Sequence, residues 1–169
     1  MHAELLVLRL IHVLGGVFWV GSGMFTAFFL MPALKESGPA AAQVLAGLQR
    51  RRMMVILPVN AIVTMLAGIR LMQITSGGFA RDYFTTPMGK TYAVSAILAI
   101  VSLLLGLVVA RPGALRLTRL TQMSASGEMD RAKLKAEMEA VQRRMAVVTM
   151  VALTLLLLSA AGMAVARYM

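Results

Sequence analysis

Two ionisable side chains, Arg9 and His12, lie in an apolar stretch that reads VLRLIHVLGGVFWVGSGMF from residue 7 to residue 25. Ionisable groups at membrane depth are costly and usually functional. A neutral imidazole is a metal ligand, and a guanidinium binds carboxylates. This stretch is therefore the first candidate site. Plain helix packing, with His12 hydrogen-bonded to a neighbouring hydroxyl or carbonyl, is the alternative.

Small residues gather on the helix face that carries His12. At ~100° per residue on a helical wheel, the residues within about 60° of His12 include Arg9, Gly15, Gly16, Trp19, Gly23 and Thr26. Small residues permit close approach of a neighbouring helix or of a flat ligand. We therefore expect this face to point into the protein.

Four apolar stretches must position these residues. A bilayer span takes ~20 mostly apolar residues, and the stretches that qualify are 5–31, 54–74, 88–110 and 145–166. Charged residues make up 14% of the chain, against about 25% in a soluble domain, and the mean hydropathy is +0.79. The sequence predicts an all-α integral membrane four-helix bundle, a single transmembrane domain over residues 1–169, with short amphipathic helices on the cytoplasmic side.

Prolines and threonines mark the expected helix ends. Pro32 and Pro112 are expected to end the first and third helices, because proline lacks a backbone donor and clashes with the preceding turn. Thr85 or Thr86 is expected to cap the third helix, with Pro87 at its first position.

The net charge of +10 is concentrated in two connections. Twelve of the seventeen Lys and Arg residues lie in 32–53 and 111–144, on one side of a four-span protein. The positive-inside rule puts these connections in the cytoplasm and both termini outside. The charge then reflects topology and contact with anionic lipid headgroups, and it gives no support to nucleic acid binding.

Several kinds of chemistry are excluded by what the chain lacks. It has no cysteine, which excludes disulfides, thiolate metal sites, iron–sulfur clusters and covalently attached haem. No span contains paired carboxylates, and the sequence has no Ser/His/Asp set and no phosphate-binding glycine loop. Whether the protein is an enzyme stays open.

A haem site is the sharpest prediction for His12. At ~1.5 Å per residue, His12 lies about 10 Å along the helix from Leu5, in the outer third of a bilayer. A neutral imidazole at that depth is suited to ligate the iron of haem b, with the porphyrin in the apolar bundle. The other candidate cofactor-binding residues are Gly16 and Trp19 beside it and, as partners of the propionates, Arg9, Arg70 and Lys90.

A second axial ligand is not evident. The only other histidine, His2, is predicted near the outer surface, short of the span. A sixth ligand would be one of the 15 methionines, an oxygen ligand, His12 of a second chain in a homo-oligomer, or nothing. Methionine also fills irregular gaps in apolar cores, so its abundance alone does not indicate a site.

The segment LRLIHVLGGVFWVG resembles the first helix of the bacterial membrane superfamily that includes copper resistance protein D and the haem-dependent membrane-bound protoporphyrinogen oxidases. His12 and Trp19 match the histidine and tryptophan of that helix, seven residues apart. RRMMVILPVNAIVTMLAG is similar to the second helix, and Lys90 stands where the oxidases open their third helix with lysine. The resemblance covers four spans in layout and the first two in motif.

The resemblance implies a haem site through His12 and location in a bacterial inner membrane. The further histidines of the oxidases and the Asn-Glu-x-Pro pattern that opens their fourth helix have no counterpart here. Three functions remain open: a b-type haem protein in electron transfer or porphyrin redox chemistry with a membrane redox partner, a non-enzymatic accessory or scaffold subunit, and a copper-handling protein.

Overall fold

The computed structural model describes residues 2–38, 40–126 and 131–169, and within these ranges all regular secondary structure is helical. In the described part of the chain, four helical stretches are long and apolar enough to cross a membrane, and these are His2–Glu36, Met53–Thr75, Pro87–Met123 and Ala132–Tyr168. The predictions of an all-α fold and of four such helices are confirmed.

The chain runs through seven α-helices and short π- or 3₁₀-helical segments, as far as the structure describes it. The α-helices are α1 (His2–Phe25), α2 (Met31–Glu36), α3 (Ala40–Arg50), α4 (Met53–Thr75), α5 (Pro87–Leu105), α6 (Arg111–Ser126) and α7 (Arg131–Val165). The predicted short helix before the second span is α3. The first part of α7 is polar, and the helix continues without a break into the fourth apolar stretch.

The prediction that Pro32 and Pro112 end their helices is wrong. The π-helical segment Thr26–Leu30 joins α1 to α2, and the π-helical segment Gly106–Ala110 joins α5 to α6, so both helices continue through the proline. A proline ring clashes with the carbonyl four residues earlier in an α-helix. The wider π turn shifts these carbonyls out of α-helical register, which removes the clash.

The start of α5 follows the prediction. Pro87 occupies its first position, where a missing backbone donor costs nothing. Thr86 has an extended backbone, and its hydroxyl accepts a hydrogen bond of 3.0 Å from the backbone nitrogen of Gly89. Thr86 is thus the cap, and Thr85 is not.

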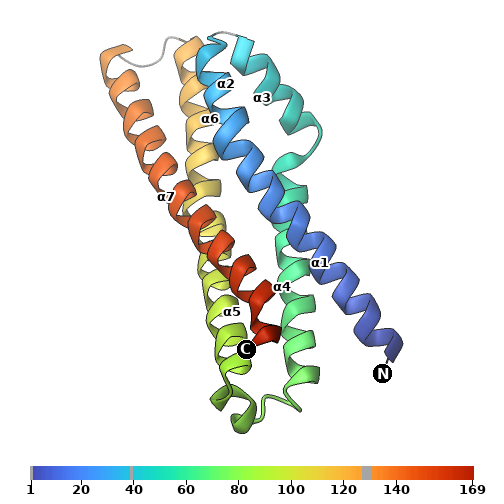
Figure 1. Ribbon diagram of the computed structural model, residues 1–169. Helices are drawn as coiled ribbons and strands as arrows, with labels where there is room; N and C mark the ends of the chain where they lie inside the picture. The colour runs from blue at the N-terminus through green and yellow to red at the C-terminus, as the bar shows by residue number, and fades with distance from the viewer. Residues whose placement is uncertain (1, 39, 127–130) are drawn as a thin grey trace.

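The long helices form two closely packed pairs, α1 with α4 and α5 with α7 (Figure 1). The pairs also touch each other, for example where α1 passes α7 at Gly23 and Leu153. Both chain ends lie at the end of the molecule that holds the α4–α5 connection, whereas α2, α3 and the neighbouring ends of α6 and α7 lie at the opposite end (Figure 1). We call this opposite end the basic end, because its segments 32–53 and 111–144 hold twelve of the seventeen Lys and Arg residues.

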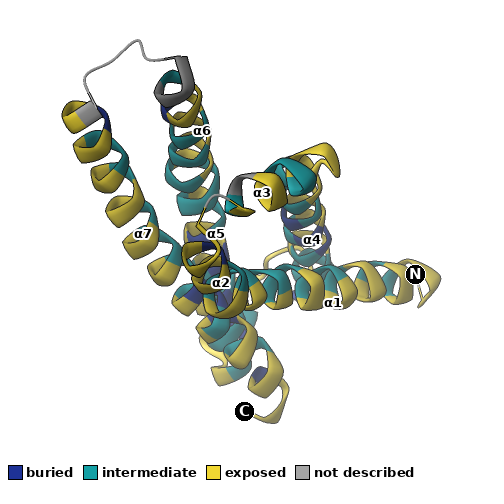
Figure 2. Cartoon of the chain, turned by 90° about the horizontal axis from the view of Figure 1, so that it is seen from above, coloured by how far each residue is buried: buried dark blue, intermediate teal, exposed yellow. Residues whose placement is uncertain are grey.

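Small residues make up the buried faces of α4 and α5, many large apolar side chains face outward, and the buried residues of α7 include Leu153 and Leu156. The buried residues of α4 are Ala61, Thr64 and Ala67, and those of α5 are Gly89, Ser95, Ala99 and Ser102. Val17 is 67% exposed and Val108 is 68% exposed, and exposed residues run along the outer side of α1 (Figure 2). Soluble proteins show the reverse distribution.

Candidate functional site

The His12 side chain reaches across from α1 to the backbone of α4. Its Nδ1 atom lies 2.8 Å from the carbonyl oxygen of Thr64, and the imidazole is half-buried. A carbonyl oxygen can only accept, so Nδ1 must carry the proton and donate it. In the neutral ring the lone pair is therefore on Nε2, the form in which a histidine ligates a metal while its other nitrogen bonds a carbonyl.

Gly68 makes this contact possible. A Cβ atom at position 68 would lie 2.5 Å from Cε1 and 2.8 Å from Nδ1 of His12, closer than packed atoms approach. The same Cβ would lie 3.5 Å from Nε2. The ring therefore turns its Nδ1–Cε1 edge toward α4, and Nε2 is the nitrogen farther from that helix.

One turn along α1, Gly15 makes a second close contact with α4. The Asn60 side-chain amide donates a hydrogen bond of 2.9 Å to the Gly15 carbonyl. The Thr64 hydroxyl lies where a Cβ of Gly15 would be, so any side chain at position 15 would collide with it. This hydroxyl is buried and has no hydrogen-bond partner within the described residues. The pairing of α1 with α4 thus depends on glycine at both 15 and 68.

The other candidate residues of α1 are Arg9, Gly16 and Trp19. Arg9 is exposed, and among the described residues it has no hydrogen bond or ion pair. Nothing lies within 4 Å of the position a Cβ of Gly16 would take. Trp19 is half-buried, and its carbonyl accepts a 3.0 Å hydrogen bond from the Ser22 hydroxyl. Gly16 leaves open space one turn from His12, on the face that the sequence singled out.

The structure does not gather the predicted cluster of basic residues. Arg70 binds the Glu4 carboxylate through Nε at 2.9 Å and Nη2 at 2.7 Å, and its Nη1 donates to Gln73. Lys90 is exposed on α5, which pairs with α7 and not with α1. Of the three, Arg9 is the one that lies on the His12 face without an acidic partner. Sequence reasoning missed Glu4, although its position as the acid in the first turn of α1 was a visible signal.

The pair formed by α5 and α7 is held by similar contacts without an ionisable residue. The Ser159 hydroxyl donates to the Ser95 carbonyl at 2.7 Å, and the Ser102 hydroxyl donates to the Ala152 carbonyl at 2.8 Å. Gly162 lies against the Ser95 hydroxyl, as Gly15 lies against that of Thr64. Helix packing therefore explains the small and polar residues of both pairs. The His12–Thr64 hydrogen bond is the contact that the packing alternative predicts, and it also orients the ring as a metal ligand would need.

Side chains of the described residues offer no cluster of ligands for a bare metal ion. The described residues contain no group of three or more His, Cys, Asp or Glu side chains that could hold one. A porphyrin brings four nitrogen ligands of its own, so its iron needs the protein for axial ligation alone. His12, with an oriented ring and a free lone pair on Nε2, fits that requirement.

Neither a protein-family model, nor a curated protein, nor a solved structure matches the chain. The fold defines the class: a helical protein with four helices, in its described residues, long and apolar enough to span a membrane. Its function must come from the contacts of its own residues.

Proposed function

We propose that the protein is a multi-pass membrane protein with its basic end in the cytoplasm and both termini outside. The outward large apolar side chains and the small buried residues of α4 and α5 support this, because a helix surrounded by lipid presents apolar groups outward and packs through small ones. The charge asymmetry supports the orientation. The resemblance of the first helix to bacterial families suggests the bacterial inner membrane.

Single cysteines test the topology, since the natural chain has none. Cysteine at Glu36 or Ser126, at the basic end, is expected to resist a membrane-impermeant thiol reagent in intact cells and to react after lysis. Thr85→Cys, in the exposed α4–α5 connection, is the matched control and is expected to react from outside. Labelling of the first two and protection of the third would invert the orientation.

Within this membrane protein, we propose a b-type haem held by His12. The observation that carries the proposal is the hydrogen bond from Nδ1 to the Thr64 carbonyl, because it orients the ring and leaves the Nε2 lone pair for the iron. Gly68 supplies the room for that hydrogen bond, and Gly16 leaves space beside it. Arg9 is the propionate partner on the same face, in place of the expected set of three cations.

The chemistry that haem would supply here is one-electron transfer. The contribution of the chain is to hold the imidazole in one orientation, to exclude water with apolar helices and to pair an anionic edge with Arg9. The α4 residues that the structure brings against His12 are Thr64 and Gly68, and neither is a catalytic acid or base, so the proposal assigns electron transfer. The redox partner would be another membrane component.

Haemin titration of the purified protein in detergent tests this function. A Soret band that saturates at one haem per chain and sharpens on reduction is expected, against a blank of the same detergent without protein. A spectrum identical to that blank at every haemin concentration would refute haem binding.

An accessory or scaffold subunit is the second candidate. It is favoured by the α5–α7 contact, where serine and glycine residues hold two helices with no ionisable group between them. Under this alternative the haemin titration matches the blank. Metal analysis of the same sample then separates a scaffold, which carries no metal, from the copper-handling protein that the family resemblance also suggests.

A further inference from the structure

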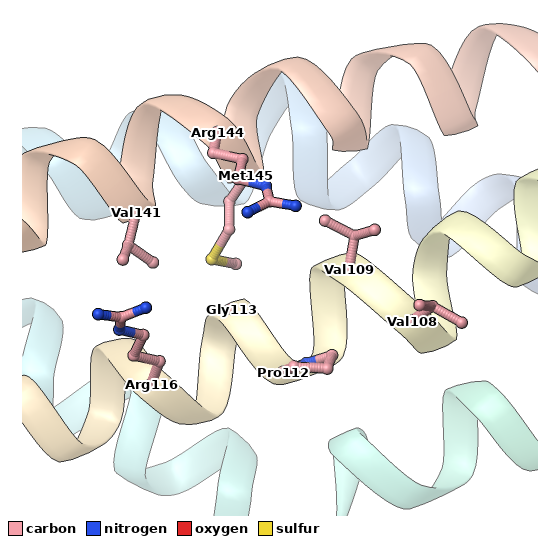
Figure 3. A pocket seen from close by; sticks show the side chains of 8 residues that line it. All are labelled: Val108, Val109, Pro112, Gly113, Arg116, Val141, Arg144 and Met145. Carbon is pink, nitrogen blue, oxygen red and sulfur yellow. The ribbon is translucent and has the colours of Figure 1, made fainter.

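A cavity of about 180 Å³ lies at the basic end, between α7 and the helix that continues from α5 through the π-helical segment into α6 (Figure 3). A site needs roughly 10–15 Å³ by this kind of measure to hold one water, so the cavity admits a much larger group. Its apolar wall includes Val108, Val109, Val141 and Met145. Arg116 of α6 and Arg144 of α7 complete the lining from opposite sides.

The two arginines differ in their partners. Arg116 forms an ion pair with the Glu137 carboxylate, so its charge is already balanced. Arg144 is exposed and has no hydrogen bond or ion pair within the described residues. The Arg144 guanidinium lies beside Met145, whereas that of Arg116 lies nearer Val141 (Figure 3). The cavity therefore carries one unbalanced positive charge next to an apolar wall.

The cavity also lies where the apolar stretches meet the polar helix ends. Val108 and Val109 belong to the third apolar stretch, and the first basic residue after it is Arg111. Arg144 immediately precedes the fourth stretch, 145–166. In the proposed membrane orientation this is the headgroup level of the cytoplasmic leaflet. An occupant at this level must present an anion to Arg144 and hydrocarbon to the valines and Met145.

We propose that this cavity is a binding site for an anionic phospholipid of the cytoplasmic leaflet. The lipid phosphate accepts hydrogen bonds from the Arg144 guanidinium, whose planar fork matches phosphate oxygens. The start of an acyl chain lies against Val108, Val109 and Met145. A free phosphate would leave this apolar wall uncovered, which is why the lipid is the favoured source of the anion. The proposal rests on the membrane location and orientation, and it does not depend on haem.

Native mass spectrometry of the protein in detergent, with added phosphatidylglycerol or phosphatidylcholine, tests the site. The wild type is expected to retain one phosphatidylglycerol at least about 10-fold more tightly than phosphatidylcholine, because phosphatidylcholine has the same phosphate but its choline cation offsets that charge beside Arg144. Arg144→Gln is expected to lose this preference. Arg143→Gln is the matched control, because this substitution removes the same charge one residue away. Arg143 pairs with Glu139 and does not line the cavity.

Three other results would overturn the proposal. Equal loss in Arg143→Gln and Arg144→Gln would mean that general positive charge, and not this cavity, attracts the lipid. Equal retention of both lipids by the wild type would mean that the cavity does not select an anionic phospholipid. Displacement of phosphatidylglycerol by inorganic phosphate at equal concentration would assign the site to a free anion. Circular dichroism of each variant verifies that the helices are intact, and the thiol-labelling result separately tests the orientation on which the proposal rests.

Discussion

His12→Ala is expected to abolish haem binding, while His2→Ala leaves it unchanged. Loss of a supporting residue around a metal site costs about 10- to 100-fold in affinity, so loss of the ligand itself should cost more than about 100-fold. His2 is the matched control because it is the only other histidine and lies in the exposed first residues of α1. The measurement is haemin titration of the three proteins in the same detergent, followed at the Soret band.

Arg9→Ala is expected to weaken haem binding without abolishing it, unlike His12→Ala. It removes the propionate partner and keeps the axial ligand, so the spectrum of bound haem should stay the same while affinity falls. A lost hydrogen bond to a charged group costs about 1.5–3 kcal/mol, which corresponds to roughly 10- to 150-fold. Equal haem content in wild type and His12→Ala would eliminate the ligand role, and α1 would then be a packing helix with an unexplained arginine.

Gly15→Ala and Gly21→Ala are expected to change stability in opposite directions. The added methyl group at position 15 would collide with the Thr64 hydroxyl, and overpacking of a close helix contact costs about 1–3 kcal/mol. At position 21 nothing lies within 4 Å of the added carbon. Alanine restricts the unfolded chain more than glycine does, so Gly21→Ala should stabilise by about 0.5–1 kcal/mol.

Reversible unfolding of the haem-free protein in mixed micelles measures both changes. The two glycines lie in the same helix and receive the same methyl group, so helix propensity contributes equally to each variant. The difference between them therefore reports the α1–α4 contact. Destabilisation by both substitutions to the same degree would show that this contact is not closely packed, and the position of His12 relative to Thr64 would then be wrong as well.

The His12 face was identified on a helical wheel, yet the wheel could not name what the ring contacts. Thr64 lies 52 residues away, and Gly68 had no role in the sequence analysis. Arg70 was also predicted to be a propionate partner, whereas the structure pairs it with Glu4, 66 residues distant. Such partners depend on how each helix is rotated and shifted against its neighbour, which no local pattern contains.

The prolines show the same limit at shorter range. Pro87 was placed correctly at the first position of α5, because a proline there needs no adjustment of the helix. Pro32 and Pro112 were expected to end helices, because the rule for proline assumes an α-helical turn before it. The turn before each of these prolines is a π turn, so the rule does not apply and both helices continue. The cavity beside Arg144 borders this continuation of α5 into α6, so it too was hidden from the sequence.

Sequence alone determined the helical class, the four long apolar helices, the side on which basic residues collect and the face on which His12 lies. These properties depend on residues close together in the sequence. They are the mean hydropathy of a span, the charge of a connecting segment and the angular position of a residue on one helix. Tertiary structure decided which helices pair, which glycines they pair through, which tautomer His12 holds and which arginine keeps a free charge. These features depend on single contacts between residues far apart in the sequence. A glycine permits such a contact only at one position, and shifting one helix by a single residue against its partner would remove it.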